Sequence, residues 1–115
     1  MVWRSIRLEL GSTEEFPAGS VSRVYLIRLP LDDRDTVDER AFRDSPAHAT
    51  VRRHWSTEPD KRGVVVQSGC NWTLQCNGDP GRALCLDGKP IRLGQAITVI
   101  EPDGTRLPFK VASVR

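Results

Sequence analysis

Two hairpin patterns stand near the end of the chain: LCLDGKPIRL at residues 84–93 and ITVIEPDGTRLPFKV at residues 97–111. In the first, Asp87-Gly88 separates two apolar runs, and both central residues of a type I′ turn need a positive φ that this pair adopts readily. In the second, Pro102 presets φ and Gly104 can take the left-handed position. These patterns predict a small, turn-rich β-protein.

The rest of the chain continues the β-pattern towards the N-terminus. In residues 2–10, Ile6, Leu8 and Leu10 alternate with polar residues, as expected for a strand with one buried face. Residues 24–29 are apolar on nearly both faces and predict a central strand that ends at Pro30. Further strands are predicted at residues 63–67, 72–76, 84–86, 89–93, 97–100 and 107–111. We therefore predict one all-β domain over residues 1–115, a small barrel or two-sheet sandwich of about eight short antiparallel strands.

One short helix interrupts this pattern. Thr36 and Glu39 have capping-box spacing, which predicts a helix over residues 37–43 that ends before Pro46. Residues 47–55 have two interpretations. Pro46 could begin a second helix with Ala47, Val51 and Trp55 at helical spacing. Alternatively, a strand places Val51, Arg53 and Trp55 on one face, and the β-branched residues favour this strand.

The predicted core follows from the inward positions of these strands. It comprises Ile6, Leu8, Tyr25, Ile27, Leu29, Val64, Val66, Trp72, Leu74, Leu84, Leu86, Ile97, Val99, Phe109 and Val111.

Composition limits the class of protein. The chain is 38% hydrophobic and 28% charged, so it carries enough apolar residues to fold around a core. Neither an export signal nor a run of about 18 apolar residues is present, which favours a soluble, cytoplasmic protein without a membrane partner. Fourteen of its 17 basic residues are arginines. Guanidinium groups recognise phosphate and carboxylate in ways that lysine does not, although a GC-rich genome produces the same excess.

The cysteines are candidates for a metal or thiol site. Cys70, Cys76 and Cys85 have His48 and His54 upstream, but they form no closely spaced ligand pair. Cys70 falls in a predicted turn, and Cys85 lies between two leucines, where a buried apolar thiol is typical. The chain also contains no P-loop, nucleophile elbow or HExxH motif. We therefore expect no cofactor and favour a non-enzymatic protein.

A basic segment suggests nucleic-acid binding. Arg52, Arg53, Lys61 and Arg62 would lie on neighbouring strands beside Trp55 and Trp72. A β-surface that combines cations with stacking aromatics is typical of proteins that bind single strands. The alternation of each strand places both tryptophans among core residues, however.

The Arg-rich pattern with regularly spaced Gly and Pro resembles that of small bacterial all-β proteins of no known activity. Residues 93–104 resemble the barrel-closing hairpins of many unrelated β-domains, and neither likeness implies an activity. Three hypotheses remain. The first is a non-enzymatic domain that binds a partner protein or a small ligand. The second is an RNA or single-stranded DNA binder that uses Arg52, Arg53, Lys61 and Arg62. The third is a metal or thiol site made by Cys70, Cys76 and Cys85.

Overall fold

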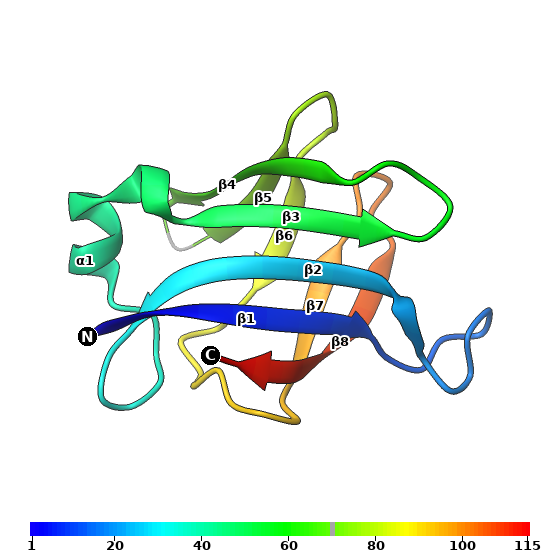
Figure 1. Ribbon diagram of the computed structural model, residues 1–115, viewed down its shortest axis with the longest axis horizontal. Helices are drawn as coiled ribbons and strands as arrows, with labels where there is room; N and C mark the ends of the chain where they lie inside the picture. Colours follow the sequence, from blue (N-terminus) through cyan, green and yellow to red (C-terminus); the bar gives the residue numbers. More distant parts are fainter. Residues whose placement is uncertain (70) are drawn as a thin grey trace.

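A computed structural model describes residues 1–69 and 71–115, which form a closed antiparallel barrel (Figure 1). Each strand pairs with the next one along the chain, and the last strand pairs with the first. The strands are β1 (Val2–Leu10), β2 (Ser20–Leu31), β3 (Thr50–Trp55), β4 (Lys61–Ser68), β5 (Asn71–Cys76), β6 (Arg82–Cys85), β7 (Ala96–Ile100) and β8 (Arg106–Val114). The predicted all-β class is confirmed, and of the two predicted architectures the chain forms the barrel.

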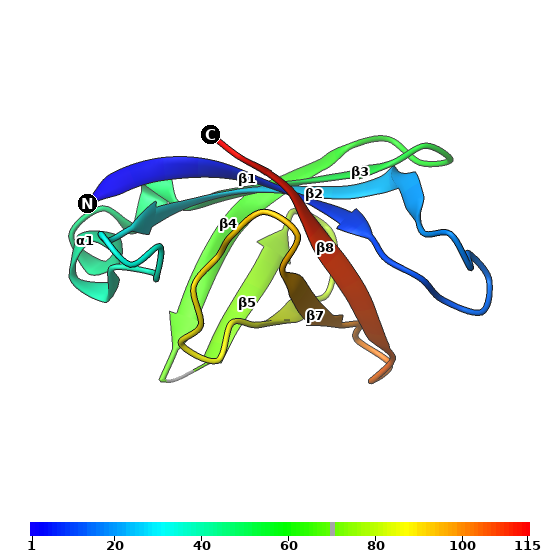
Figure 2. The ribbon, with the colours of Figure 1, turned by 90° about the horizontal axis from the view of Figure 1, so that it is seen from below.

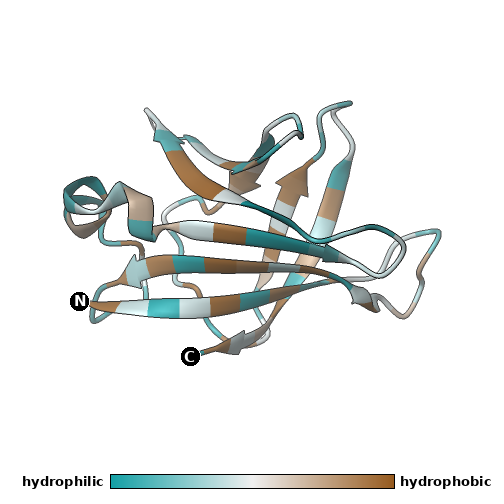
Figure 3. Cartoon of the chain, turned by 45° about the horizontal axis from the view of Figure 1, so that its top comes forward, coloured by the Kyte–Doolittle hydropathy of each residue, from teal (hydrophilic) through white to brown (hydrophobic). Residues whose placement is uncertain are grey.

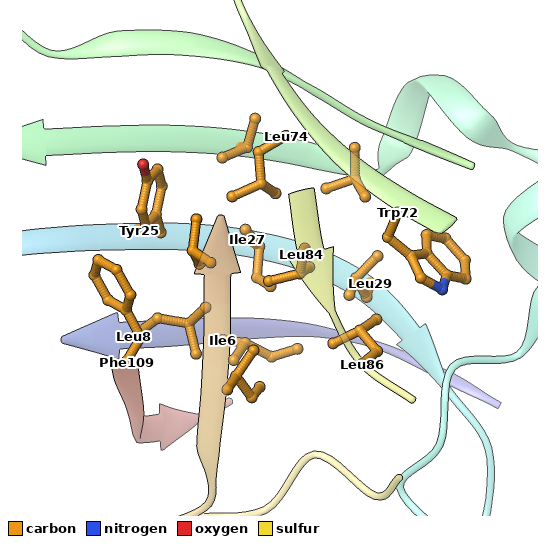
Figure 4. Packing of buried hydrophobic residues seen from close by; sticks show 14 of the residues in the cluster. Ile6, Leu8, Tyr25, Ile27, Leu29, Trp72, Leu74, Leu84, Leu86 and Phe109 are labelled. Carbon is orange, nitrogen blue, oxygen red and sulfur yellow. The ribbon is translucent and has the colours of Figure 1, made fainter. Parts of the chain in front are cut away.

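Alternating side chains fill the barrel. Along most strands, apolar and polar residues take turns, as Figure 3 shows by colour. The inward positions make one hydrophobic cluster, in which Tyr25 packs edge-to-face on Phe109 with ring centroids 5.1 Å apart (Figure 4). An eight-stranded barrel has an interior just wide enough for side chains, so the core fills it.

The predicted core is correct except on β4. Val64 and Val66 are exposed by 37% and 40%, whereas Val65 between them is buried. In a run of three valines, either the middle residue or the two outer ones could point inward, so hydrophobicity alone does not determine which side chains are buried. The register chooses it, because Gly63 lies opposite the inward-facing Val51 and places Val65 on the same inner face.

One end of the barrel is covered by the short helix α1 (Glu39–Asp44) and a 3₁₀ turn, η1 (Pro46–His48). The helix buries Phe42, whose ring packs edge-to-face on Trp72 at 5.0 Å. The predicted helix is present, but its cap is different: Asp38, rather than Thr36, accepts a hydrogen bond from the Ala41 amide. For residues 47–55 the favoured strand interpretation is confirmed, since β3 places Val51, Arg53 and Trp55 on one face. The helix interpretation is wrong beyond the single turn η1, which Pro46 begins.

One strand extends past the proline predicted to end it, and one predicted strand is absent. β2 continues through Pro30 to Leu31, with Pro30 opposite Trp3. The strand predicted at residues 89–93 does not form, although Asp87 and Gly88 have the predicted positive φ values of 53° and 65°. Instead, β6 pairs with β7, and the intervening loop buries Ile91, whose amide donates to the Asp35 carbonyl.

Strands β1 and β8 lie side by side and close the barrel (Figure 2). The predicted hairpin of β7 and β8 is confirmed, with Gly104 at a φ of 89° in its turn. Strands β4 and β5 pair with each other, while Cys70 in their connection lies outside the described residues. Within the described part, neither helix has the length and hydrophobicity to cross a membrane.

Candidate nucleic-acid interface

The four basic residues predicted to bind nucleic acid divide between two faces of the barrel wall. On β3, Val51, Arg53 and Trp55 are buried inside, and Arg52 is exposed outside. The register pairs Arg52 with Arg62 and Arg53 with Lys61 across β3 and β4. Because paired residues share a face, Arg52 and Arg62 belong to the outer surface, and Arg53 and Lys61 point towards the interior.

The outer pair borders a groove on the surface of the wall. The groove has a volume of about 430 Å³ and crosses β1 to β4. Three arginines line it: Arg28 on β2, Arg52 on β3 and Arg62 on β4. Its remaining lining residues are Ser5, Leu26, Ile27, Thr50, Val51 and Gly63. This lining contains three cations and no carboxylate, so its charge suits an anion.

Only one of the three arginines has an ion-pair partner among the described residues. One Asp60 oxygen accepts a hydrogen bond from Arg52 Nε at 2.8 Å, and the other lies 2.7 Å from His54 Nδ1. The hydrogen bond to His54, and then that to Arg52, lowers the pKa of the Asp60 carboxyl below its usual value. Arg52 and Arg62 lie directly opposite each other in the sheet, where like charges repel. A bound anion would relieve that repulsion.

The inner pair belongs to a network of charges at the end of the barrel opposite α1. The loops after β3, β5 and β7 meet there, because successive turns of an up-and-down barrel alternate between its ends. Asp79, from the loop after β5, accepts hydrogen bonds from Arg53 Nη1 at 3.1 Å, from Lys61 Nζ at 3.2 Å and from Arg82. Arg82 also donates to Glu101, and Arg53 donates to Glu58.

This network has a structural role. The Arg53 residue is only 5% exposed, and its guanidinium lies 4.6 Å from the centre of the Trp55 ring. A buried charge needs a partner of opposite sign, and Asp79 is such a partner for Arg53, shared with Lys61 and Arg82. Arg53 and Arg82 therefore connect three loops at the end of the barrel through Glu58, Asp79 and Glu101, on the opposite face from the outer groove.

Tyr25 lies next to this network inside the barrel. Its ring packs edge-to-face on Trp55 at 5.3 Å, and its hydroxyl has no hydrogen-bond partner within the described part of the chain. Burial, followed by the charge of Glu101, raises the pKa of the phenol well above its usual value. The hydroxyl therefore stays protonated and contributes no charge to the network.

We expect Tyr25→Phe to leave the free energy of unfolding unchanged or slightly higher. A buried hydroxyl without a partner costs about 1–3 kcal/mol, and replacing it with hydrogen removes that cost without losing a bond. Urea unfolding followed by tryptophan fluorescence measures the change. A loss of more than about 1 kcal/mol would indicate that the hydroxyl is hydrogen-bonded in solution.

The two cysteines that the structure describes lie on different faces of the wall. Cys76 is buried inside, and burial raises the pKa of its thiol, which opposes the thiolate form that a metal requires. Cys85 follows the buried Leu84 and faces the outer surface, where it lines a groove of about 130 Å³. Cys70 is outside the described residues. Among the residues that the structure describes, no three Cys, His, Asp or Glu side chains lie close enough to hold a metal.

Arg28 is a site residue that the sequence prediction missed. It lies between Ile27 and Leu29, which are both buried, so alternation places it on the outer face of β2. The sequence does not show which strand lies next to Arg28. The barrel register places this part of β2 beside β3, where Ile27 pairs with Val51.

Comparison with known proteins found no matching family model, no matching curated protein and no matching solved structure. A barrel fold alone does not define a function, so we argue function from the geometry of the outer groove.

Proposed function

We propose that this chain is a non-enzymatic β-barrel domain that binds RNA or single-stranded DNA on the outer face of β2 to β4. The observation that carries the proposal is the convergence of Arg28, Arg52 and Arg62 on one groove whose lining has no carboxylate. Proteins that bind single strands use a cationic groove along the sugar–phosphate backbone. Arginine forks suit this role because they can donate two hydrogen bonds to one phosphate.

The barrel interior gives less support to the alternative of a small ligand. The inward side chains form one packed hydrophobic cluster, with Tyr25, Phe109, Ile6 and Leu8 among its largest fully buried members. A ligand inside would have to displace them. The outer groove needs no such rearrangement, because its arginines are already exposed.

The first experiment measures the binding of fluorescent oligouridylate and oligothymidylate as a function of salt. We expect affinity to fall as salt rises from about 50 to 200 mM, because bound phosphates release counterions. The triple variant Arg28→Gln/Arg52→Gln/Arg62→Gln should bind more weakly and lower the salt slope by about 2, since each lost contact to a single strand contributes about 0.7. Fluorescence anisotropy gives both quantities.

Two matched variants test whether binding depends on this groove or on the overall positive charge of the protein. Arg106→Gln/Lys110→Gln removes two exposed cations from β8 and should leave binding nearly unchanged. Asp60→Asn should strengthen binding, because it frees Arg52 from its ion pair. The proposal is wrong if the chain binds neither oligonucleotide at low salt, or if the β8 variant weakens binding as much as the triple arginine variant does.

A further inference from the structure

A pair of aromatic rings lies beside the arginine groove, on the same side of the barrel wall. Trp3 is the third residue of the chain and belongs to β1, where it shares a face with Ser5 and Arg7. Its ring meets the imidazole of His48 edge-to-face, with centroids 5.7 Å apart and an interplanar angle of 73°. Trp3 is half-buried against the core, whereas His48 is exposed. The tryptophan therefore supports the histidine, and the histidine faces the solvent.

The groove continues to this histidine. A second hollow of about 330 Å³ is lined by Arg28, Ala47, His48 and Thr50. Arg28 and Thr50 line both hollows, so the surface is continuous from Arg62 on β4 to His48 at the end of η1. The lining of the second hollow also contains no carboxylate. The arginine side chains and the His48 ring thus line one continuous surface.

The backbone holds His48 in place. It is the last residue of η1, which begins with Pro46, whose ring fixes φ. The His48 amide donates to the Ser45 carbonyl at 3.0 Å, and the Ala49 amide donates to the Pro46 carbonyl at 3.2 Å. A ring whose backbone is fixed and which already packs on Trp3 loses little further freedom when it stacks on a ligand.

We infer that His48 is a stacking site for one unpaired nucleobase, with Trp3 as its positioning residue and Arg28 as the contact for the adjacent phosphate. This inference depends on the proposed nucleic-acid function and adds a base-binding residue to the arginine groove. Histidine rings and arginine planes stack on exposed bases in single strands. The bases of a duplex already stack on each other, so the site selects single strands over duplexes.

The test compares an oligonucleotide with an abasic oligonucleotide of equal length, which retains the phosphates but has no bases to stack. His48→Ala should weaken binding of the normal oligonucleotide about fivefold to a hundredfold, the usual effect of losing one stacked base. Binding of the abasic strand should not change. His48→Phe should restore affinity for the normal strand, because phenylalanine retains a flat ring. Thermal melting of each variant checks that the fold is intact.

Tryptophan fluorescence gives an independent test of whether a base binds next to Trp3, at His48. Trp55 and Trp72 are each only 8% exposed, so the emission of the half-buried Trp3 responds most to a base on His48. The normal strand should change this emission, the abasic strand should not, and Trp3→Phe should abolish the change.

The outcomes distinguish the two proposals. If neither strand binds, the proposed function itself fails. If both strands bind equally and His48→Ala changes neither, the arginine groove stands and the stacking site is wrong. Equal affinity for a duplex and a single strand would also overturn the stacking site.

Discussion

Asp79→Asn is expected to lower the free energy of unfolding by about 3–5 kcal/mol, the usual cost of removing one partner from a buried ion pair. The Asp79 carboxylate, with its side chain only 9% exposed, accepts hydrogen bonds from Arg53, Lys61 and Arg82. Its loss leaves the buried guanidinium of Arg53 with Glu58 alone, and the Glu58 side chain is 46% exposed. For a domain of this size the melting temperature should fall by about 10–20 °C. Urea unfolding and calorimetry measure the two effects.

Asp60→Asn is the matched control for this change. Asp60 also contacts two basic side chains, Arg52 and His54, but it lies on the exposed side of the wall. Exposed ion pairs contribute little to stability, and salt screens them further, so we expect almost no loss. The loss in Asp79→Asn should persist in high salt. If the two variants are equally stable, the network does not hold the end of the barrel together.

The sequence predicts the fold class well because the relevant signals are local. Alternation at Ile6, Leu8 and Leu10 and the turn at Pro102 to Gly104 each depend on a few neighbouring residues. The prediction fails where contacts between residues far apart in the sequence determine the local structure. In the loop at residues 89–93, Ile91 and Leu93 alternate with Arg92 as in a strand, but the Ile91 amide donates to the carbonyl of Asp35, which is far away in the sequence. Likewise, the β4 side chains that point inward are determined by the pairing of Gly63 with Val51 on β3.

The candidate site is only half predictable for the same reason. Basic residues at 52, 53, 61 and 62 are visible in the sequence, and alternation already separates residue 52 from residue 53. Their partners are not visible, because Asp79 joins Arg53 across 26 positions and Arg28 reaches the groove only through the register of β2 and β3. The aromatic pair of Trp3 and His48 likewise depends on the closure of the barrel end.

Gly63→Ala is expected to destabilise the fold by about 3 kcal/mol or more, at the upper end of the usual cost of overpacking. A Cβ atom at this position would lie 1.8 Å from the Gln75 carbonyl oxygen and 2.7 Å from the Cys76 Cα. Both atoms belong to the backbone of β5, so no side chain can rotate away to make room. The ladder between β4 and β5 must separate locally, and chemical denaturation measures the cost.

Gly81→Ala is the matched control, because its Cβ would meet side-chain atoms instead: Thr73 Cγ2 at 2.8 Å and Gln75 Oε1 at 3.0 Å. The Gln75 end can move, so we expect a much smaller loss than at Gly63. The comparison also bears on function. Gly63 lines the groove next to Arg62, and the register that it permits places Arg62 opposite Arg52. Any Gly63→Ala protein that still folds should therefore bind oligonucleotides more weakly although it retains all three groove arginines. Unchanged binding and stability would mean that the close approach of β4 and β5 does not set the position of Arg62.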